Sequence, residues 1–397
     1  MASPSSLTSH SAGPRKYSRE LVLLTTVLLL LLGTIFTAFA TRMYHKKYHV
    51  LGDAWFARGQ ASFQSGDAQT ALTDFRNALI YNPTNANFQF HLAQALAGTG
   101  RNEEARAYLV NLLSESPGSG QINLELARIA TRTGPKAMPD AVRYYHAAIY
   151  GEWDTDPIAT RWQIRREFCE YLLDHPATNQ ATNQAESEVI ALADNTSPDD
   201  VAEQKVAGSL LLRTRMWSRA LQEFQTLLAH DPHDEDALAG AATAAFNLAQ
   251  YSRAAEYFDR LPRERRAEPD LAAMYATSRD ILSASPFLSG LTTDEKVKRT
   301  AIALERAEAR ANDCIRRSDG TPAAGAENSA LQEELATTNR MASDWTERNL
   351  RKFPERIEPA MSSVFKLEDL AGERCGEPQG PDYALWQLGR SRGGNGR

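Results

Sequence analysis

The stretch Trp55–Pro83, WFARGQASFQSGDAQTALTDFRNALIYNP, decides how this chain folds. Two further stretches that end in proline align with it, Gln89–Pro117 (QFHLAQALAGTGRNEEARAYLVNLLSESP) and Gln204–Pro232 (QKVAGSLLLRTRMWSRALQEFQTLLAHDP). The landmarks that recur 34 residues apart are Gly66 and Gly100, Ala71 and Ala105, and Pro83 and Pro117. Self-similarity at such a period is typical of stacked repeats, because one unit cannot cover its own apolar face.

The pattern resembles the tetratricopeptide repeat, whose signature is Trp-x2-Leu-Gly-x2-Tyr, then Ala-x3-Phe, then Pro. The residues that carry it in the first stretch are Trp55, Gly59, Ala71, Phe75, Ala78 and Pro83. Arg58 replaces the leucine of the signature, and Ser62 stands at the tyrosine position. The resemblance implies an all-α fold, an α-solenoid of antiparallel helix pairs in which small residues let helices approach and proline ends each unit.

The chain is expected to divide into segments around this solenoid. We expect the tetratricopeptide repeat solenoid to occupy residues 48–266 and a helical C-terminal cap region to occupy residues 267–388. The polar residues 1–20 and the glycine-rich residues 389–397 are expected to form disordered tails.

The composition is that of an ordinary folded protein. Of 397 residues, 42% are hydrophobic and 24% are charged, which excludes a collagen and a chain that is disordered throughout. The formal net charge of −6 argues against a general affinity for nucleic acid. The three cysteines form no CxxC pair, and no phosphate-binding glycine loop, HExxH or GxSxG motif occurs. We therefore expect no cofactor, no metal and no catalytic residue.

An apolar run precedes the repeats. Leu21–Ala40 has 20 residues without a charge, and as a helix this run reaches about 30 Å, the thickness of the hydrocarbon core of a bilayer. Basic residues before it and the Ala38-Phe39-Ala40 sequence also fit a signal peptide that is removed. The run is longer than the core of such a peptide, so we favour a single transmembrane helix that is retained as a signal anchor.

The orientation of this helix is not decided by charge, because three basic residues lie on either flank. A short polar tail before a lone span more often stays in the cytosol. We therefore expect a single-pass protein of the inner (cytoplasmic) membrane whose soluble domain is periplasmic, or more generally extracytoplasmic.

The resemblance also implies where a partner would bind. Arrays of this family usually hold an extended peptide or a helix on the concave face, which the first helix of each pair lines. The residues that this rule places on the face are Phe56, Gln60, Phe63 and Gln64 from the first unit, Phe90, His91 and Gln94 from the second, and Leu124 and Arg128 from the third. Alternatively, some of these aromatic side chains merely pack between helices.

The family members that capture a C-terminal carboxylate use a clamp of lysine, arginine and asparagine on three successive first helices. In that neighbourhood this sequence has Phe56, Gln60, His91, Gln121 and Glu125, so the clamp is absent. A groove of aromatic and amide side chains suits an extended backbone better than a charged chain end.

Two cysteines lie in the C-terminal region. Cys314 and Cys375 are 61 residues apart and could form a disulfide in an oxidising compartment, where it would staple the final helices. Alternatively, both are unpaired thiols. Cys169 lies on an otherwise amphipathic helix and is expected to be a small core residue.

The leading interpretation is a membrane-tethered scaffold or adaptor that binds a protein or peptide partner on its concave face and has no catalysis of its own. An envelope enzyme, or an accessory subunit of one, with its function in the helical region Ala267–Arg397 is the alternative. That region has no histidine, so acid–base chemistry there would fall to carboxylates. A third interpretation is a structural spacer without a ligand.

Overall fold

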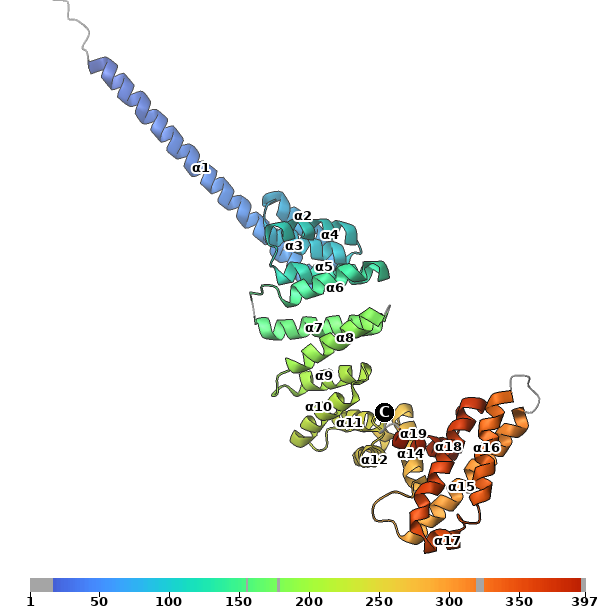
Figure 1. The fold of residues 1–397 in the computed structure, drawn as a ribbon. Helices are drawn as coiled ribbons and strands as arrows, with labels where there is room; N and C mark the ends of the chain where they lie inside the picture. The colour runs from blue at the N-terminus through green and yellow to red at the C-terminus, as the bar shows by residue number, and fades with distance from the viewer. Residues whose placement is uncertain (1–16, 155, 177–178, 319–324, 394–397) are drawn as a thin grey trace, which may run out of the picture. The chain divides into compact units, whose positions relative to one another are not determined.

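A computed structural model describes residues 17–154, 156–176, 179–318 and 325–393. All regular elements within these ranges are helices, and they form two compact units, one ending at Arg165 and the other beginning at Arg166. The boundary falls inside α7 (Pro157–Asp174). The predicted all-α architecture of antiparallel helix pairs is confirmed, and each unit is described below by itself (Figure 1).

The N-terminal unit is a row of helical hairpins in which each helix packs on the next. Its elements before α7 are α1 (Tyr17–Gln64), α2 (Ala68–Tyr81), α3 (Ala86–Gly98), α4 (Asn102–Glu115), α5 (Gly120–Thr133), the short η1 (Pro135–Ala137) and α6 (Met138–Ile149). The first helices α1, α3 and α5 also contact one another in sequence, as the stacking of repeats requires.

The first hairpin shows why the sequence pattern folds in this way. Gly59 on α1 faces the ring of Phe75 on α2, and a Cβ atom at Gly59 would lie 2.7 Å from that ring. Only glycine therefore lets the two helices approach this closely. At the connection, Gly66 has a positive φ of 86°, and the Asp67 side chain caps α2 by accepting a hydrogen bond from the Thr70 amide.

Arg58, which replaces the signature leucine, has a clear structural role. Its Nε donates to Oδ2 of Asp74 at 2.9 Å, and its guanidinium lies 3.9 Å from the centre of the Trp55 ring. Asp74 is buried, so the ion pair compensates a charge on the inner side of α2. Arg58, which departs from the repeat signature, is therefore paired with Asp74 on the next helix.

The apolar run and the first repeat belong to one helix. α1 contains 48 residues and runs without a break from Tyr17 through Ala40 to Gln64. Its apolar part projects from the hairpins, and none of it is covered by other described parts of the chain (Figure 1). This segment is long and apolar enough to cross a membrane. Residues 17–20, expected within a disordered tail, are already helical, whereas residues 1–16 lie outside the described ranges.

The C-terminal unit begins with helical hairpins of its own and ends in a helical bundle. Its elements after α7 are α8 (Asn179–Asp194), α9 (Val201–Arg213), α10 (Trp217–His230), α11 (Glu235–Asn247), α12 (Tyr251–Arg260), α13 (Arg263–Arg266), α14 (Pro269–Ala284), α15 (Thr293–Ser318), α16 (Gly325–Met341), α17 (Glu347–Lys352), η2 (Pro354–Arg356), α18 (Ile357–Cys375) and α19 (Pro381–Gly393). Hairpins form from α9 with α10 and from α11 with α12.

The final bundle has one apolar core, to which α14, α15, α16, α18 and α19 contribute. α19 packs on α14 and α18 and buries Leu385 and Leu388. Because α19 extends to Gly393, residues 389–393 are helical rather than part of the expected disordered tail, and residues 394–397 lie outside the described ranges. Apolar contacts with the bundle explain why this glycine-containing end forms a helix.

Candidate partner-binding groove

A groove with a volume of about 530 Å³ crosses the first-helix face of the C-terminal unit. Its walls come from α9 and α11 and from the segment that contains α13 and the start of α14. The lining residues are Lys205, Val206, Ser209, Leu212, Phe224, Asp236, Ala239, Gly240, Thr243, Arg265, Glu268, Asp270, Leu271 and Met274. Below, the term groove means the surface formed by these residues.

Small residues form the floor of the groove. Ala239 and Gly240 form the floor on α11, and the Phe224 ring from α10 lies directly beneath them. A Cβ atom at Gly240 would lie 2.3 Å from this ring, and one at Gly208 would lie 2.7 Å from it. Two glycines on successive first helices thus clamp one aromatic ring and keep the floor low.

Apolar side chains line the groove above this floor, with two hydroxyl groups between them. Val206, Leu271 and Met274 provide apolar surface from α9 and α14. Ser209 and Thr243 donate their hydroxyl protons to carbonyl oxygens of their own helices, at 2.7 and 2.8 Å. Their oxygen atoms can still accept a hydrogen bond, so the groove can contact both apolar side chains and peptide amides.

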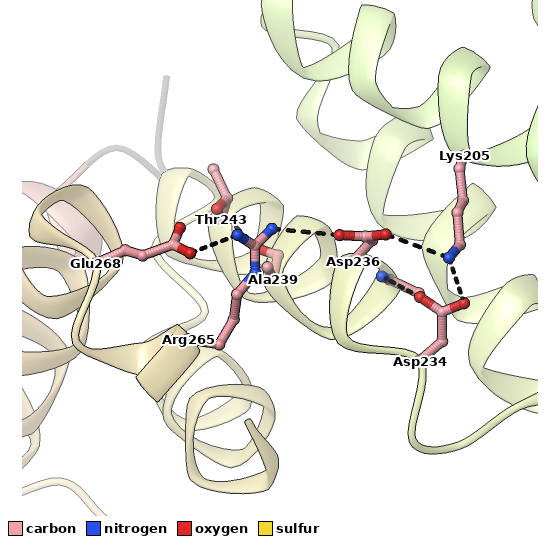
Figure 2. Close-up of polar contacts among 8 residues, drawn as sticks. Lys205, Asp234, Asp236, Ala239, Thr243, Arg265 and Glu268 are labelled. Carbon is pink, nitrogen blue, oxygen red and sulfur yellow. Dashed lines mark hydrogen bonds and ion pairs between the residues drawn. The ribbon is translucent and has the colours of Figure 1, made fainter. Parts of the chain in front are cut away.

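A line of paired charges runs along the rim of the groove. Lys205 Nζ on α9 lies 2.7 Å from Asp234 Oδ2 and 3.3 Å from Asp236 Oδ2 on the next hairpin. Figure 2 shows Asp236 between Lys205 and Arg265, whose Nη2 lies 3.2 Å from Asp236 Oδ1. Arg265 also pairs with Glu268. The rim therefore joins three successive segments through alternating charges.

These contacts also set the protonation of the rim. The Asp234 carboxylate raises the pKa of Lys205. Burial would raise the pKa of Asp234, but hydrogen bonds from Lys205 and from the Ala237 amide outweigh it, and the pKa lies below its usual range. Both groups therefore stay charged across physiological pH.

Sequence reasoning missed this groove because it concentrated on the first three helix pairs. Lys205 and Asp236 are 31 residues apart, and Asp236 and Arg265 are 29 apart, which is close to one repeat. Opposite charges at this spacing on first helices were the available signal. Asp234 also caps α11, because its side chain accepts a hydrogen bond from the Ala237 amide at 3.0 Å.

The predicted aromatic residues of the N-terminal unit form a cluster between helices. Phe56 stacks on Phe88 at 4.6 Å between ring centres and meets His91 edge to face at 4.9 Å. Phe90 and Leu124 are both buried, with 6% and 8% of their surfaces exposed. These two residues therefore support the first-helix face from below and offer little surface of their own to a partner.

The predicted polar residues are partly joined to one another. Gln94 Nε2 donates to Glu125 Oε1 at 3.1 Å, and Arg128 Nη1 lies 3.2 Å from the same oxygen. Gln60 and Phe63 are half-buried on α1, and Gln64 is exposed. The structure thus brings Gln94 and Arg128 together around Glu125. Glu125 is one of the residues that stand where a carboxylate clamp would have basic or amide side chains.

The remaining predicted residues lie in the C-terminal bundle. Cys314 on α15 and Cys375 at the end of α18 are joined as a disulfide, with 5.9 Å between their Cα atoms. Cys169 is buried in α7. Among the described residues, no group of three or more histidine, cysteine, aspartate or glutamate side chains could hold a metal ion.

The architecture is that of a helical-hairpin repeat protein with a groove on the first-helix face. Sequence models of the tetratricopeptide repeat match residues 62–112 and 211–277, and a second model of this repeat matches residues 92–157. These matches show that the chain contains tetratricopeptide repeats within residues 62–157 and 211–277.

Solved structures with a similar arrangement include a tetratricopeptide repeat protein from Parabacteroides merdae ATCC 43184. It is 14% identical, the match covers 63% of this chain and 91% of that one, and the TM-score is 0.37. The TPR2AB domain of yeast Sti1, solved as a complex with pHSP90, is 16% identical over 58% of this chain and 99% of that one, with a TM-score of 0.23. A comparison with curated proteins finds no match.

Proposed function

We propose that the chain is a membrane-tethered adaptor that binds a segment of a partner protein in the groove and has no catalysis of its own. Tetratricopeptide repeats support a role in protein–protein interaction. The groove is the observation that supports binding of a partner segment at this place. It has a floor of small residues, apolar walls, and a rim of ion pairs that joins three successive segments.

The geometry favours an extended segment of the partner. Three neighbouring helical segments at the usual spacing of 8–10 Å span about 20 Å, which corresponds to about six residues of extended chain. Small or medium apolar side chains of this segment fit above Ala239, and its amides can donate to Ser209 and Thr243. Such binding combines apolar burial with main-chain hydrogen bonds.

The rim favours an internal segment over a chain end. Lys205 is already shared between two aspartates, and Arg265 is paired with Asp236 and Glu268. Binding a terminal carboxylate would require one of these cations to exchange a partner that it already holds. The residues predicted on the N-terminal unit, above all Phe56, Gln94 and Arg128, are proposed to extend partner contact along the first helices of that unit.

The tether is proposed to be the apolar part of α1. Its twenty uncharged residues are exposed along their length, which is unfavourable in water and favourable in a bilayer. In this proposal the helix is a retained anchor of the inner membrane and the repeats are extracytoplasmic. Partner capture would then occur at the surface of that membrane.

Filling the groove tests the function directly. Ser209→Trp places a bulky ring in the groove at an exposed position, so it should reduce recovery of a stoichiometric partner at least about tenfold, equivalent to about 1.4 kcal/mol. Ser218→Trp, at an exposed position on the second helix α10, is the matched control. Recovery is measured by affinity purification of the full chain from solubilised membranes, followed by quantitative mass spectrometry.

Phe56→Ala and Gln94→Ala test the N-terminal unit in the same way. If the Ser209→Trp and Ser218→Trp chains recover equal amounts of the partner, the partner does not bind in the groove. If only the N-terminal variants then reduced recovery, the partner would bind on α1 and α3.

A further inference from the structure

The end of α2 lies beside the part of α1 that follows the apolar run. α2 packs antiparallel to the last turns of α1, so its final residues return toward the apolar segment (Figure 1). The Tyr48 and Tyr81 rings meet edge to face at 5.5 Å, and Asn82 Nδ2 lies 3.3 Å from His49 Nδ1. One corner of the first repeat is therefore fixed at a defined height above the apolar segment.

This corner carries apolar side chains that no other described part of the chain covers. Ile80 is 70% exposed, Val50 is 59% exposed and Leu51 is 37% exposed. Together with Tyr48 and Tyr81 they form what we call the membrane-proximal patch. Single exposed apolar residues are common on proteins, but a group at one corner indicates an interaction surface.

Two of the aligned repeats do not carry such residues at these positions, whereas the third hairpin has the exposed Tyr150 at the position of Ile80. In the repeat alignment, Ser114 and Ala229 stand at the position of Ile80, and Glu115 and His230 stand at the position of Tyr81. All four end their helices in the same way and are exposed. Packing within the repeat therefore does not demand an apolar residue here, and Ile80 is the one of these positions whose repeat includes the apolar helix α1.

The height of the patch matches the interface of a bilayer. At 1.5 Å per residue, Tyr48 lies about 12 Å along α1 from Ala40. The headgroup region extends about 5–8 Å beyond the hydrocarbon core on each side. An average helix tilt of about 20° lowers a neighbouring helix on the inclined side by about 3 Å. The end of α2 beside Tyr48 then lies about 9 Å from the hydrocarbon core, just beyond the outer edge of the headgroup region, so that its side chains can reach that region, where tyrosine rings are enriched.

We propose that the membrane-proximal patch contacts the lipid headgroup region, so that the first repeat rests on the bilayer instead of standing free above it. This proposal rests on the membrane anchoring proposed above. Contact at a second point, away from the axis of α1, would resist tilting and would orient the first-helix face relative to the membrane plane. A second copy of the chain is the competing occupant that the test must separate.

A fluorescent probe at position 80 tests this contact. The Ile80→Cys chain is labelled with an NBD group and reconstituted, at full length, into vesicles of phosphatidylcholine and phosphatidylglycerol. The matched control is Ser114→Cys, the equivalent exposed position one repeat further on. The unsubstituted chain, in which Cys169 is buried and the other two cysteines are paired, provides the background. Headgroup-quencher lipids then report contact with the interface.

We expect blue-shifted emission and at least about twofold stronger quenching at position 80 than at position 114, independent of the protein-to-lipid ratio. Equal, water-like emission at both positions in chains that float with the vesicles would overturn the lipid contact and leave the anchor intact. A blue shift at position 80 that disappears on dilution in lipid would overturn it in favour of contact between copies. Chains that fail to float would instead refute the anchor itself.

Discussion

Glu368 shows how one buried side chain makes the C-terminal unit sensitive to pH. It lies on α18 with 1% of its surface exposed and pairs with Arg310 on α15. Arg310 also donates to the main-chain oxygens of Glu368, at 3.2 Å, and Gly376, at 3.0 Å. Burial raises the pKa of Glu368 to about 7, although the positive charge of Arg310 opposes the shift.

The raised pKa predicts the direction of the pH effect. Between pH 4.5 and about 7 the folded chain holds a proton that the unfolded chain releases, so the free energy of unfolding falls as pH rises through this interval. At 1.36 kcal/mol per pKa unit the complete loss is about 3 kcal/mol. Glu368→Gln cannot titrate, so its free energy of unfolding should depend less on pH by about this amount.

Urea denaturation of the full chain in detergent at pH 5 and pH 8, followed by circular dichroism, measures this difference. Glu305→Gln, at an exposed position on α15, is the control and should keep the pH dependence of the unsubstituted chain. If Glu368→Gln and Glu305→Gln respond to pH alike, then Glu368 titrates as an exposed carboxylate does.

At the scale of helices, the repeat period predicts which helices pack together, but it does not predict which side chains line the surface of the groove. Ala71 and Phe75 are predictable because they are buried against the partner helix, where only a few shapes fit, and Pro83 is predictable because proline cannot continue α2. The charged rim was not predicted because Lys205 and Arg265 are only half-buried, and many side chains fit a half-buried position at a surface. Similarly, the pairing of Arg58 with Asp74 follows from the angle between two helices and not from either residue alone.

The disulfide is the element that ties two helices of the bundle together. Cys314 and Cys375 close a loop of 61 residues between the end of α15 and the end of α18. By chain entropy, such a loop stabilises the folded state by about 4 kcal/mol. Reductant should therefore lower the midpoint of thermal unfolding of the C-terminal unit, and non-reducing peptide mapping should recover the two cysteines in one cross-linked fragment.

A double variant, Cys314→Ala with Cys375→Ala, provides the control for this prediction. Its thermal midpoint should already be lowered and should no longer respond to reductant. Cys169→Ala, which leaves the pair untouched, should keep the response. Recovery of free thiols at both positions from the native membrane would show that the pair is reduced there.

At the scale of the N-terminal unit, the continuous helix α1 connects the apolar segment to the repeats without a flexible linker. The sequence predicts an apolar helix and a first repeat, but it does not predict that the two form one helix. The reason is that residues 41–51 mix charged and aromatic side chains and show no helical spacing of apolar residues. The contacts of Tyr48 with Tyr81 and of Gly52 with Phe88 stabilise this stretch as a helix. If the apolar segment is the proposed anchor, a partner bound to the first helices of this unit is held at a fixed distance from the membrane.

This continuity makes the fate of the N-terminus the sharpest test of the whole arrangement. A retained anchor predicts that the mature chain keeps the peptide before Leu21 and resists extraction by carbonate. The proposed extracytoplasmic location of the repeats predicts that a phosphatase fused after Arg397 is active and that a fluorescent protein at that point is dark. Intact-mass measurement is decisive: a mature chain that begins at Thr41 would mean that the apolar run is a removed signal. The reverse pattern of reporter activity would place the repeats, and the Cys314–Cys375 pair, in the cytosol, where a stable disulfide is not expected.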